Sequence, residues 1–139
     1  MLGTLDANGH ISSRPMTVLE NDFDGDLWFF ASRSANFIKH IEDVGEVNLT
    51  FTQNHSYLSA NGHALIVKDG GKKLELWRPA YKTWFPEGIE DPDLVMIKVQ
   101  VHSADFWEAP SMKVVRLLGF AKAMVTGKAT DLGKHGHLN

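Results

Sequence analysis

The segment from residue 94 to residue 107 constrains the fold more than any other part of this chain. Its hydrophobic residues Val95, Ile97, Val99 and Val101 alternate with other residues, several of them polar. A period of two residues is typical of a β-strand that buries one face. The segment therefore predicts the longest strand of a fold that is rich in β structure.

Five shorter segments also have the composition or the alternation of strands. The Asn8-Gly9 pair is a good turn signal between the first two, and it predicts an opening hairpin. The Leu-Trp-Phe-Phe run at residues 27–30 has the aromatic enrichment of a buried strand. A turn centred near Phe23 and Asp24 would pair this strand with the one before it. The five predicted strands are residues 2–5, 10–19, 26–31, 46–52 and 57–68.

Helical spacing appears in only three places. Residues 34–44 place their hydrophobic side chains on one face, and Ser34 is available as the N-cap. Residues 72–85 have similar spacing, but Pro79 divides them into two short helical pieces. Residues 111–125 predict a further helix. Six strands with antiparallel hairpins and few helices predict a mainly β protein, a small antiparallel β-barrel rather than alternating βαβ units.

Composition limits the class of protein. The chain has 139 residues, of which 43% are hydrophobic, and a net charge of -3, which suits one domain at residues 1–127 followed by a loose tail at 128–139. The mild acidity disfavours a nucleic-acid partner. The sequence has no long apolar run and no signal peptide, so we expect no membrane contact and a cytoplasmic location. It has no cysteine and no HExxH motif, so we expect no metal site.

Cations and serines gather around the start of the helix predicted at residues 34–44. The antiparallel pairing described above sets Arg14 opposite residues 32–33, to within a residue or two. The start of a helix exposes unpaired N–H groups and the positive end of the helix dipole. Ser32, Ser34 and Lys39 add hydroxyl and ammonium donors, and a guanidinium suits phosphate oxygens. Together these groups predict a site for a phosphate monoester.

Each of these residues also has a purely structural interpretation. Ser34 would only cap the helix, Arg14 and Arg33 would be solvated, and Lys39 would pair with Asp43 one turn along the helix. Spacing alone does not choose between an anion site and these structural roles.

Three aromatic residues leave a similar choice. Trp77, Tyr81 and Trp84 could form a wall for a stacked ring, or they could belong to the core or to a dimer interface. Aromatic residues at helical spacing more often have one of the latter two roles, so the interface is the favoured interpretation.

Several short motifs occur in a fixed order along nearly the whole chain. They are Ser13–Met16, Asp24–Ala31, Ser32–Ser34 with Lys39, Leu76–Pro79, Trp84–Gly88, Asp91–Leu94 and Ala104–Trp107. In this order the motifs resemble the pyridoxamine 5′-phosphate oxidase-like, FMN-binding split β-barrels, and in particular their general stress protein 26 branch.

That resemblance implies a homodimer with two FMN molecules at the interface, each touched by both subunits. The phosphate would lie at the corner described above, the ring would lie against Met16 and the Phe30–Ala31 backbone, and Trp107 would approach from the second subunit. The residues implied to bind the cofactor are Arg14, Pro15, Met16, Phe30, Ala31, Ser32, Ser34, Lys39 and Trp107.

The resemblance implies two classes of function. One is a flavin-dependent oxidoreductase that uses NAD(P)H or another small donor and an unknown acceptor. The other is a protein that binds or buffers FMN without turnover, since no general acid or base stands beside the predicted ring site. A pyridoxamine 5′-phosphate oxidase, a deazaflavin protein and a haem protein are lesser alternatives. No residue is assigned a catalytic role.

Overall fold

The computed structural model describes residues 1–21, 25–107 and 135–138 of the chain. The helix predicted at residues 111–125 lies outside the described residues. In chain order the elements are β1 Leu2–Leu5, β2 Ile11–Arg14, β3 Asp26–Ser32, α1 Asn36–Asp43, β4 Glu46–Gln53, β5 Ser56–Val67, α2 Gly70–Leu76, the 3₁₀ helices η1 Pro79–Thr83 and η2 Gly88–Glu90, β6 Leu94–Trp107 and β7 His135–Leu138.

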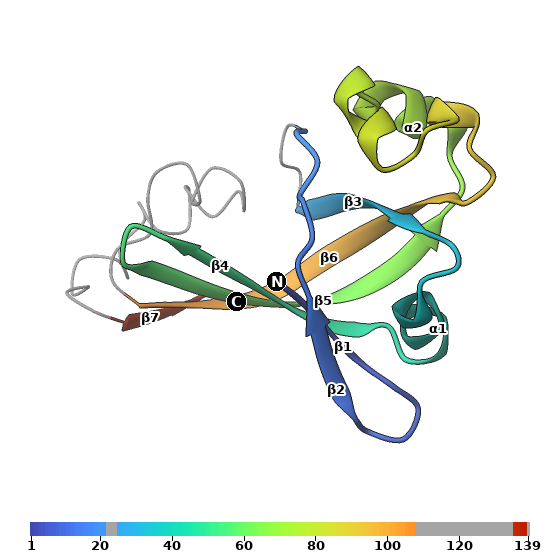
Figure 1. Ribbon diagram of the computed structural model, residues 1–139. Coiled ribbons are helices and arrows are strands. Elements are labelled where there is room, and N and C mark those ends of the chain that lie inside the picture. Colours follow the sequence, from blue (N-terminus) through green and yellow to red (C-terminus); the bar gives the residue numbers. More distant parts are fainter. Residues whose placement is uncertain (22–24, 108–134, 139) are drawn as a thin grey trace.

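The strands form one antiparallel sheet in the order β2-β1-β4-β5-β6-β3, and β7 pairs with the far end of β6. Figure 1 shows this sheet curled, with α1 and α2 on opposite sides of β3 and β6. The prediction of a mainly β, antiparallel split barrel of about six strands is confirmed. Among the described strands β6 is the longest, at 14 residues, as predicted. None of the described helices is long and apolar enough to span a membrane.

The pairing of β3 differs from the sequence prediction. β1 and β2 form the expected hairpin, in which Leu2 lies opposite Arg14. β3, however, pairs with β6 along its whole length, from Asp26 to Ser32. The Leu19 N–H does donate to the Trp28 carbonyl over 2.9 Å, but β2 itself ends at Arg14. Pro15 follows at once, and it has no N–H with which to continue a ladder.

The aromatic run in β3 faces two different clusters. Leu27, Phe29 and Ala31 are buried in the main core together with α1. Trp28 and Phe30 point the other way and pack in a smaller cluster beneath α2 and η1. Alternation of side chains along a strand requires this division. β3 is therefore hydrophobic on both faces, because both are covered.

The two helical pieces predicted within residues 72–85 are present. α2 ends at Leu76, and η1 begins at Pro79. The proline sits at the start of η1, where its missing N–H is tolerated.

The end of the described chain adds a strand to the sheet. Residues His135–Leu138 form β7 and pair with residues 104–107 of β6. These four residues are therefore paired with the sheet, and the rest of the tail predicted at residues 128–139 lies outside the described residues.

Candidate flavin site

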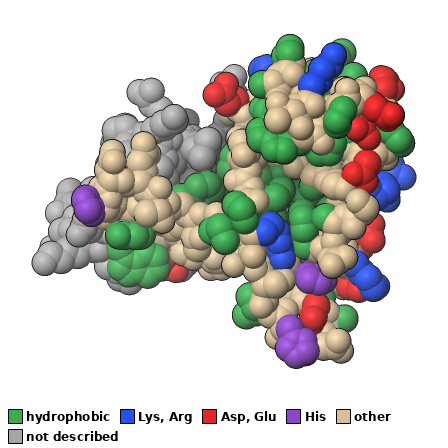
Figure 2. All heavy atoms as spheres, in the orientation of Figure 1, with side chains coloured by type: hydrophobic (Ala, Val, Ile, Leu, Met, Phe, Trp, Pro, Cys, Tyr) green, Lys and Arg blue, Asp and Glu red, His purple; other side chains and the backbone are tan. Residues whose placement is uncertain are grey.

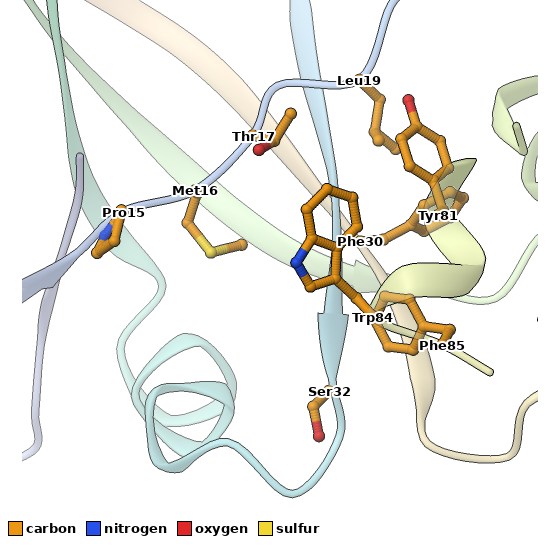
Figure 3. A pocket seen from close by; sticks show the side chains of 9 residues that line it. All are labelled: Pro15, Met16, Thr17, Leu19, Phe30, Ser32, Tyr81, Trp84 and Phe85. Atoms are coloured by element: carbon orange, nitrogen blue, oxygen red, sulfur yellow. The ribbon is translucent and has the colours of Figure 1, made fainter.

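A cavity of about 550 Å³ opens beside β3. Its walls come from the segment after β2, from β3 itself, and from the η1 turn and the residues that follow it. Figure 3 shows the lining side chains around the ring of Trp84 and the side chain of Phe30. Figure 2 shows hydrophobic side chains gathered in the middle of this face, with several acidic ones along its right edge. The lining residues are Pro15, Met16, Thr17, Leu19, Phe30, Ser32, Tyr81, Trp84 and Phe85.

One wall of the cavity is aromatic. The Phe30 ring lies 5.7 Å from the Tyr81 ring and 5.8 Å from the Trp77 ring, and the Tyr81 and Trp84 rings are 6.3 Å apart. Trp84 is 63% exposed in spite of these contacts. Aromatic faces of this kind bind planar rings by stacking and by burial of apolar surface. The wall is therefore suited to a flat, conjugated ligand.

Ser32 lines the cavity and is the last residue of β3, so the cavity borders the corner between β3 and α1. The pairing of β3 with β6 continues for one residue beyond each strand. There the Arg33 N–H donates to the Asp93 carbonyl over 2.7 Å. This register brings the Asp93 side chain to the corner. The Ser32 hydroxyl donates to one carboxylate oxygen, the Ser34 N–H donates to the other over 3.1 Å, and the two serine hydroxyls are 2.8 Å apart. Asp93 thus accepts hydrogen bonds from the Ser32 hydroxyl and the Ser34 N–H, two of the donors that the sequence assigned to a phosphate.

Ser34 is not the N-cap of α1, so that prediction is wrong. The cap residue is Ala35, which makes no side-chain cap hydrogen bond, and the helix begins at Asn36. The reason is the contact just described, because the Ser34 backbone and hydroxyl belong to the Ser32 and Asp93 cluster instead.

The same hydrogen bonds lower the pKa of Asp93. The largest contribution comes from the Ser32 hydroxyl, followed among the lowering effects by the Ser34 N–H. A carboxyl whose pKa is lower in the folded state stabilises the fold above its ordinary pKa, here 3.8, and loses that contribution as pH falls through the folded value. We expect the free energy of unfolding of the wild type to fall below pH 3.8 more steeply than that of Asp93→Asn.

Urea unfolding at pH 7, 4 and 3 measures this difference. Glu90→Gln removes a charge from the same loop and should follow the wild type. Parallel curves for wild type and Asp93→Asn would contradict the expectation.

Arg14 is held at the edge of the hairpin, close to α1. Its Nη1 donates to the Leu2 carbonyl and to Thr4 Oγ1 at 3.2 and 2.9 Å, and its Nη2 donates to Ser12 Oγ at 2.8 Å. Its Cζ lies 4.6 Å from the centre of the Phe37 ring. A guanidinium has five N–H groups, and within the described parts of the chain only three of them are used. Arg14 therefore keeps two donors for a ligand.

Lys39 forms the ion pair that its structural interpretation predicts. Its Nζ lies 2.8 Å from Asp43 Oδ2, and the lysine side chain is 77% exposed. The hydrogen bond with Asp43 is the main cause of the raised pKa of Lys39. The residue also lines a neighbouring hollow of about 460 Å³ with Arg33 and Ser34. Lys39 is therefore near the corner, but its charge is already partly satisfied.

The structure brings together some of the predicted site residues and not others. Pro15, Met16, Phe30 and Ser32 line the one cavity. Ser34 and Lys39 line the adjoining hollow, and Arg14 stands beside α1. Ala31 is 6% exposed and belongs to the main core, so its side chain faces away from the cavity. Trp107 is 43% exposed at the end of β6 opposite to the corner, so this chain does not itself bring Trp107 to the cavity.

The residues that the sequence did not assign to the site are Thr17, Leu19, Tyr81, Trp84, Phe85 and Asp93. The sequence allows the aromatic residues at 81 and 84 to form a ring-stacking wall, but it favours an interface for them. Asp93 belongs to the Asp91–Leu94 motif, but nothing in that motif connects it with Ser32, which lies 61 residues away in the chain. Among the described residues, no group of three His, Asp or Glu could hold a metal ion.

Comparisons with known proteins agree with this fold. Protein bli-3 of Neurospora crassa is 25% identical over 146 residues, which cover 96% of this chain and 70% of bli-3. A general stress FMN/FAD binding protein of Xanthomonas citri is 29% identical, with a TM-score of 0.66 and coverage of 81% of this chain and 82% of that one. A Clostridium acetobutylicum protein related to general stress protein 26 is 23% identical, has a TM-score of 0.69, covers 77% of each chain, and shows the shared fold.

The family assignment depends on a longer match. The family of proteins described as pyridoxamine 5′-phosphate oxidase like matches residues 1–131, nearly the whole chain. The resemblance predicted from the ordered motifs is thereby confirmed, and the chain belongs to the pyridoxamine 5′-phosphate oxidase-like family.

Proposed function

We propose that this protein binds FMN, with the flavin ring in the 550 Å³ cavity and the phosphate toward Arg14 and the β3–α1 corner. The observation that carries the proposal is the joining of an aromatic cavity to a corner rich in donors. The cavity offers ring faces at Phe30 and Trp84, and the corner offers the Ser32 and Ser34 donors. The name of the Xanthomonas citri relative, which includes FMN/FAD binding, supports the same ligand.

Each part of the proposed site has a separate task. The Arg14 guanidinium supplies two free donors and a positive charge for the phosphate. Met16 and Phe30 give the ring apolar surface, and Ser32 stands where the cavity meets the corner. Lys39 adds a second charge if it exchanges Asp43 for the phosphate.

A bound flavin supplies electron transfer, while the protein supplies position, charge and access. On this basis we propose an oxidoreductase that takes electrons from NAD(P)H or another small donor. A second candidate, a binding protein without turnover, is favoured by one observation. None of the nine residues lining the cavity is Asp, Glu, His, Lys or Arg, so among these nine only Tyr81 could serve as a general acid or base.

We also propose that the working form is a cytoplasmic homodimer with the flavin at the interface. Trp107 stands at the far end of β6 from the corner, so it would reach a flavin only from a second copy. The 63% exposure of Trp84 leaves one ring available for such a contact. Light scattering of the flavin-bound protein should give the mass of a dimer.

The first test of the proposed function is the absorbance spectrum of the purified protein, followed by mass spectrometry of any released ligand. We expect flavin absorbance and the mass of FMN. If the protein is colourless and added FMN shows no fluorescence quenching, the proposal fails. Anaerobic mixing with NADH or NADPH then separates the two candidates, because an oxidoreductase with that donor bleaches its flavin and a binding protein does not.

A further inference from the structure

The β3–α1 corner contains its own anion. The Asp93 carboxylate accepts hydrogen bonds from the Ser32 hydroxyl and from the Ser34 N–H, one at each oxygen. The Ser34 hydroxyl lies 2.8 Å from Ser32 Oγ and extends the cluster. A phosphate oxygen at this corner would need the same donors. An aspartate carboxylate resembles part of a phosphate in charge and in its acceptor oxygens.

The backbone around Asp93 is fixed, which keeps its side chain beside the serines. The Arg33 N–H donates to the Asp93 carbonyl, and the Asp93 N–H donates to Asp91 Oδ1 over 2.9 Å. The Leu94 N–H donates to the Asp91 carbonyl over 3.0 Å. The carboxylate is thus presented to the corner by the β3–β6 register and by the turn at residues 91–93, before any ligand arrives.

The carboxylate itself is held by hydrogen bonds alone. Within residues 1–21 and 25–107, no lysine or arginine forms an ion pair with Asp93. The lowered pKa of Asp93 keeps it ionised at neutral pH. A dianion placed on Ser32 and Ser34 would therefore lose two donors to Asp93 and would also face its negative charge at short range.

We propose that Asp93 is an affinity-setting residue that competes with the ligand phosphate for the Ser32 and Ser34 donors. This inference rests on the proposed function, and it adds a free-energy cost of binding that applies only to ligands with a phosphate. Binding of FMN exchanges the carboxylate for the phosphate at the corner. Binding of riboflavin, which has the same ring and no phosphate, requires no such exchange.

Asp93→Asn tests the competition with little change of shape. The amide can still accept a hydrogen bond from the Ser34 N–H through its oxygen, but it carries no charge and cannot accept at both positions. Fluorescence quenching should be measured with FMN and with riboflavin on the wild type and on the variant. We expect Asp93→Asn to bind FMN at least tenfold more tightly than the wild type, with riboflavin affinity unchanged within about twofold.

Glu90→Gln is the matched control, since it removes one negative charge from an exposed position in the same loop. It should leave both affinities near those of the wild type. An equal gain in Glu90→Gln would mean that general charge, and not the corner, sets the affinity, and it would overturn the proposal. Unchanged or weaker FMN binding in Asp93→Asn would overturn it as well, because Asp93 would then be only a support for the serines.

A second variant protects the test against loss of folding. Asp93→Ser removes the carboxylate and leaves a short hydroxyl, and thermal unfolding of both variants shows whether each is folded. Where Asp93→Asn is folded, its result decides. Where it is not folded, a selective gain for FMN in folded Asp93→Ser upholds the proposal, and the absence of that gain overturns it. If neither FMN nor riboflavin binds to any of these proteins, the proposed function itself fails. The riboflavin measurements distinguish that outcome from a failure of the competition alone.

Discussion

An Arg14→Ala variant is expected to bind FMN about ten- to a hundredfold more weakly than the wild type, a loss of roughly 1.5 to 3 kcal/mol for a hydrogen bond to a charged group. Arg14 is the cation proposed for the phosphate, because its guanidinium is held by Leu2, Thr4 and Ser12 and still keeps two donors. A locked side chain loses little entropy when a ligand arrives. Fluorescence quenching with FMN and with riboflavin measures the effect.

The comparison of the two ligands separates phosphate binding from damage to the hairpin. Arg14 also packs on Phe37, so its loss could disturb the site as a whole. In that case FMN and riboflavin would weaken together, and the role assigned to Arg14 would be refuted. Lys39→Ala should have a smaller effect, because that lysine is exposed and already paired with Asp43.

Changing Phe29 to alanine should mainly lower stability, whereas changing its neighbour Phe30 to alanine should mainly weaken flavin binding. Phe29 is fully buried in the main core, and its loss should lower the free energy of unfolding by about 3 to 5 kcal/mol. Phe30 is only partly buried and lines the cavity. Its loss should cost less stability but weaken binding of FMN and riboflavin alike, by roughly 2 kcal/mol if the ring packs on it.

Urea unfolding and flavin titration of both variants check this pair. Each variant is the control for the other, since the two positions are adjacent on β3 and face opposite ways. If Phe30→Ala binds both flavins as the wild type does, the ring does not lie in this cavity.

Patterns within single segments predicted most of the elements, because alternation, turn residues and Pro79 act locally. The β1–β2 hairpin, the long β6 and the break between α2 and η1 are all of this kind. The pairing of β3 could not be predicted in the same way. A turn signal favours pairing with the preceding strand, yet β3 pairs with β6, which lies far along the chain. β6 extends both clusters that β3 joins, with Ile97 and Val99 in the main core and Met96 in the smaller cluster.

The same limit applies to the site. The sequence predicted that Ser32 and Ser34 lie at one corner, and the structure places their hydroxyls 2.8 Å apart, with Asp93 bonded to both residues. The sequence also placed Arg14 near α1, and Arg14 does pack on Phe37 of that helix. The prediction relied, however, on a pairing of β2 with β3, whereas β2 pairs with β1 and β3 pairs with β6. Asp93 adds a carboxylate to the corner, and it reaches Ser32 only through the β3–β6 register. A contact of this kind depends on the completed sheet and leaves no local pattern.

The place of β3 in the sheet also sets an order for folding during synthesis. β3 is made early, but its pairing partner is residues 94–100. On the ribosome the Leu-Trp-Phe-Phe strand cannot pair with β6 until most of the chain has been made. Until then it is an unpaired edge rich in aromatic residues. β1, β2, β4 and β5 can pair among themselves in the meantime. The candidate flavin site, which β3 helps to build, is therefore completed only when β6 has been added.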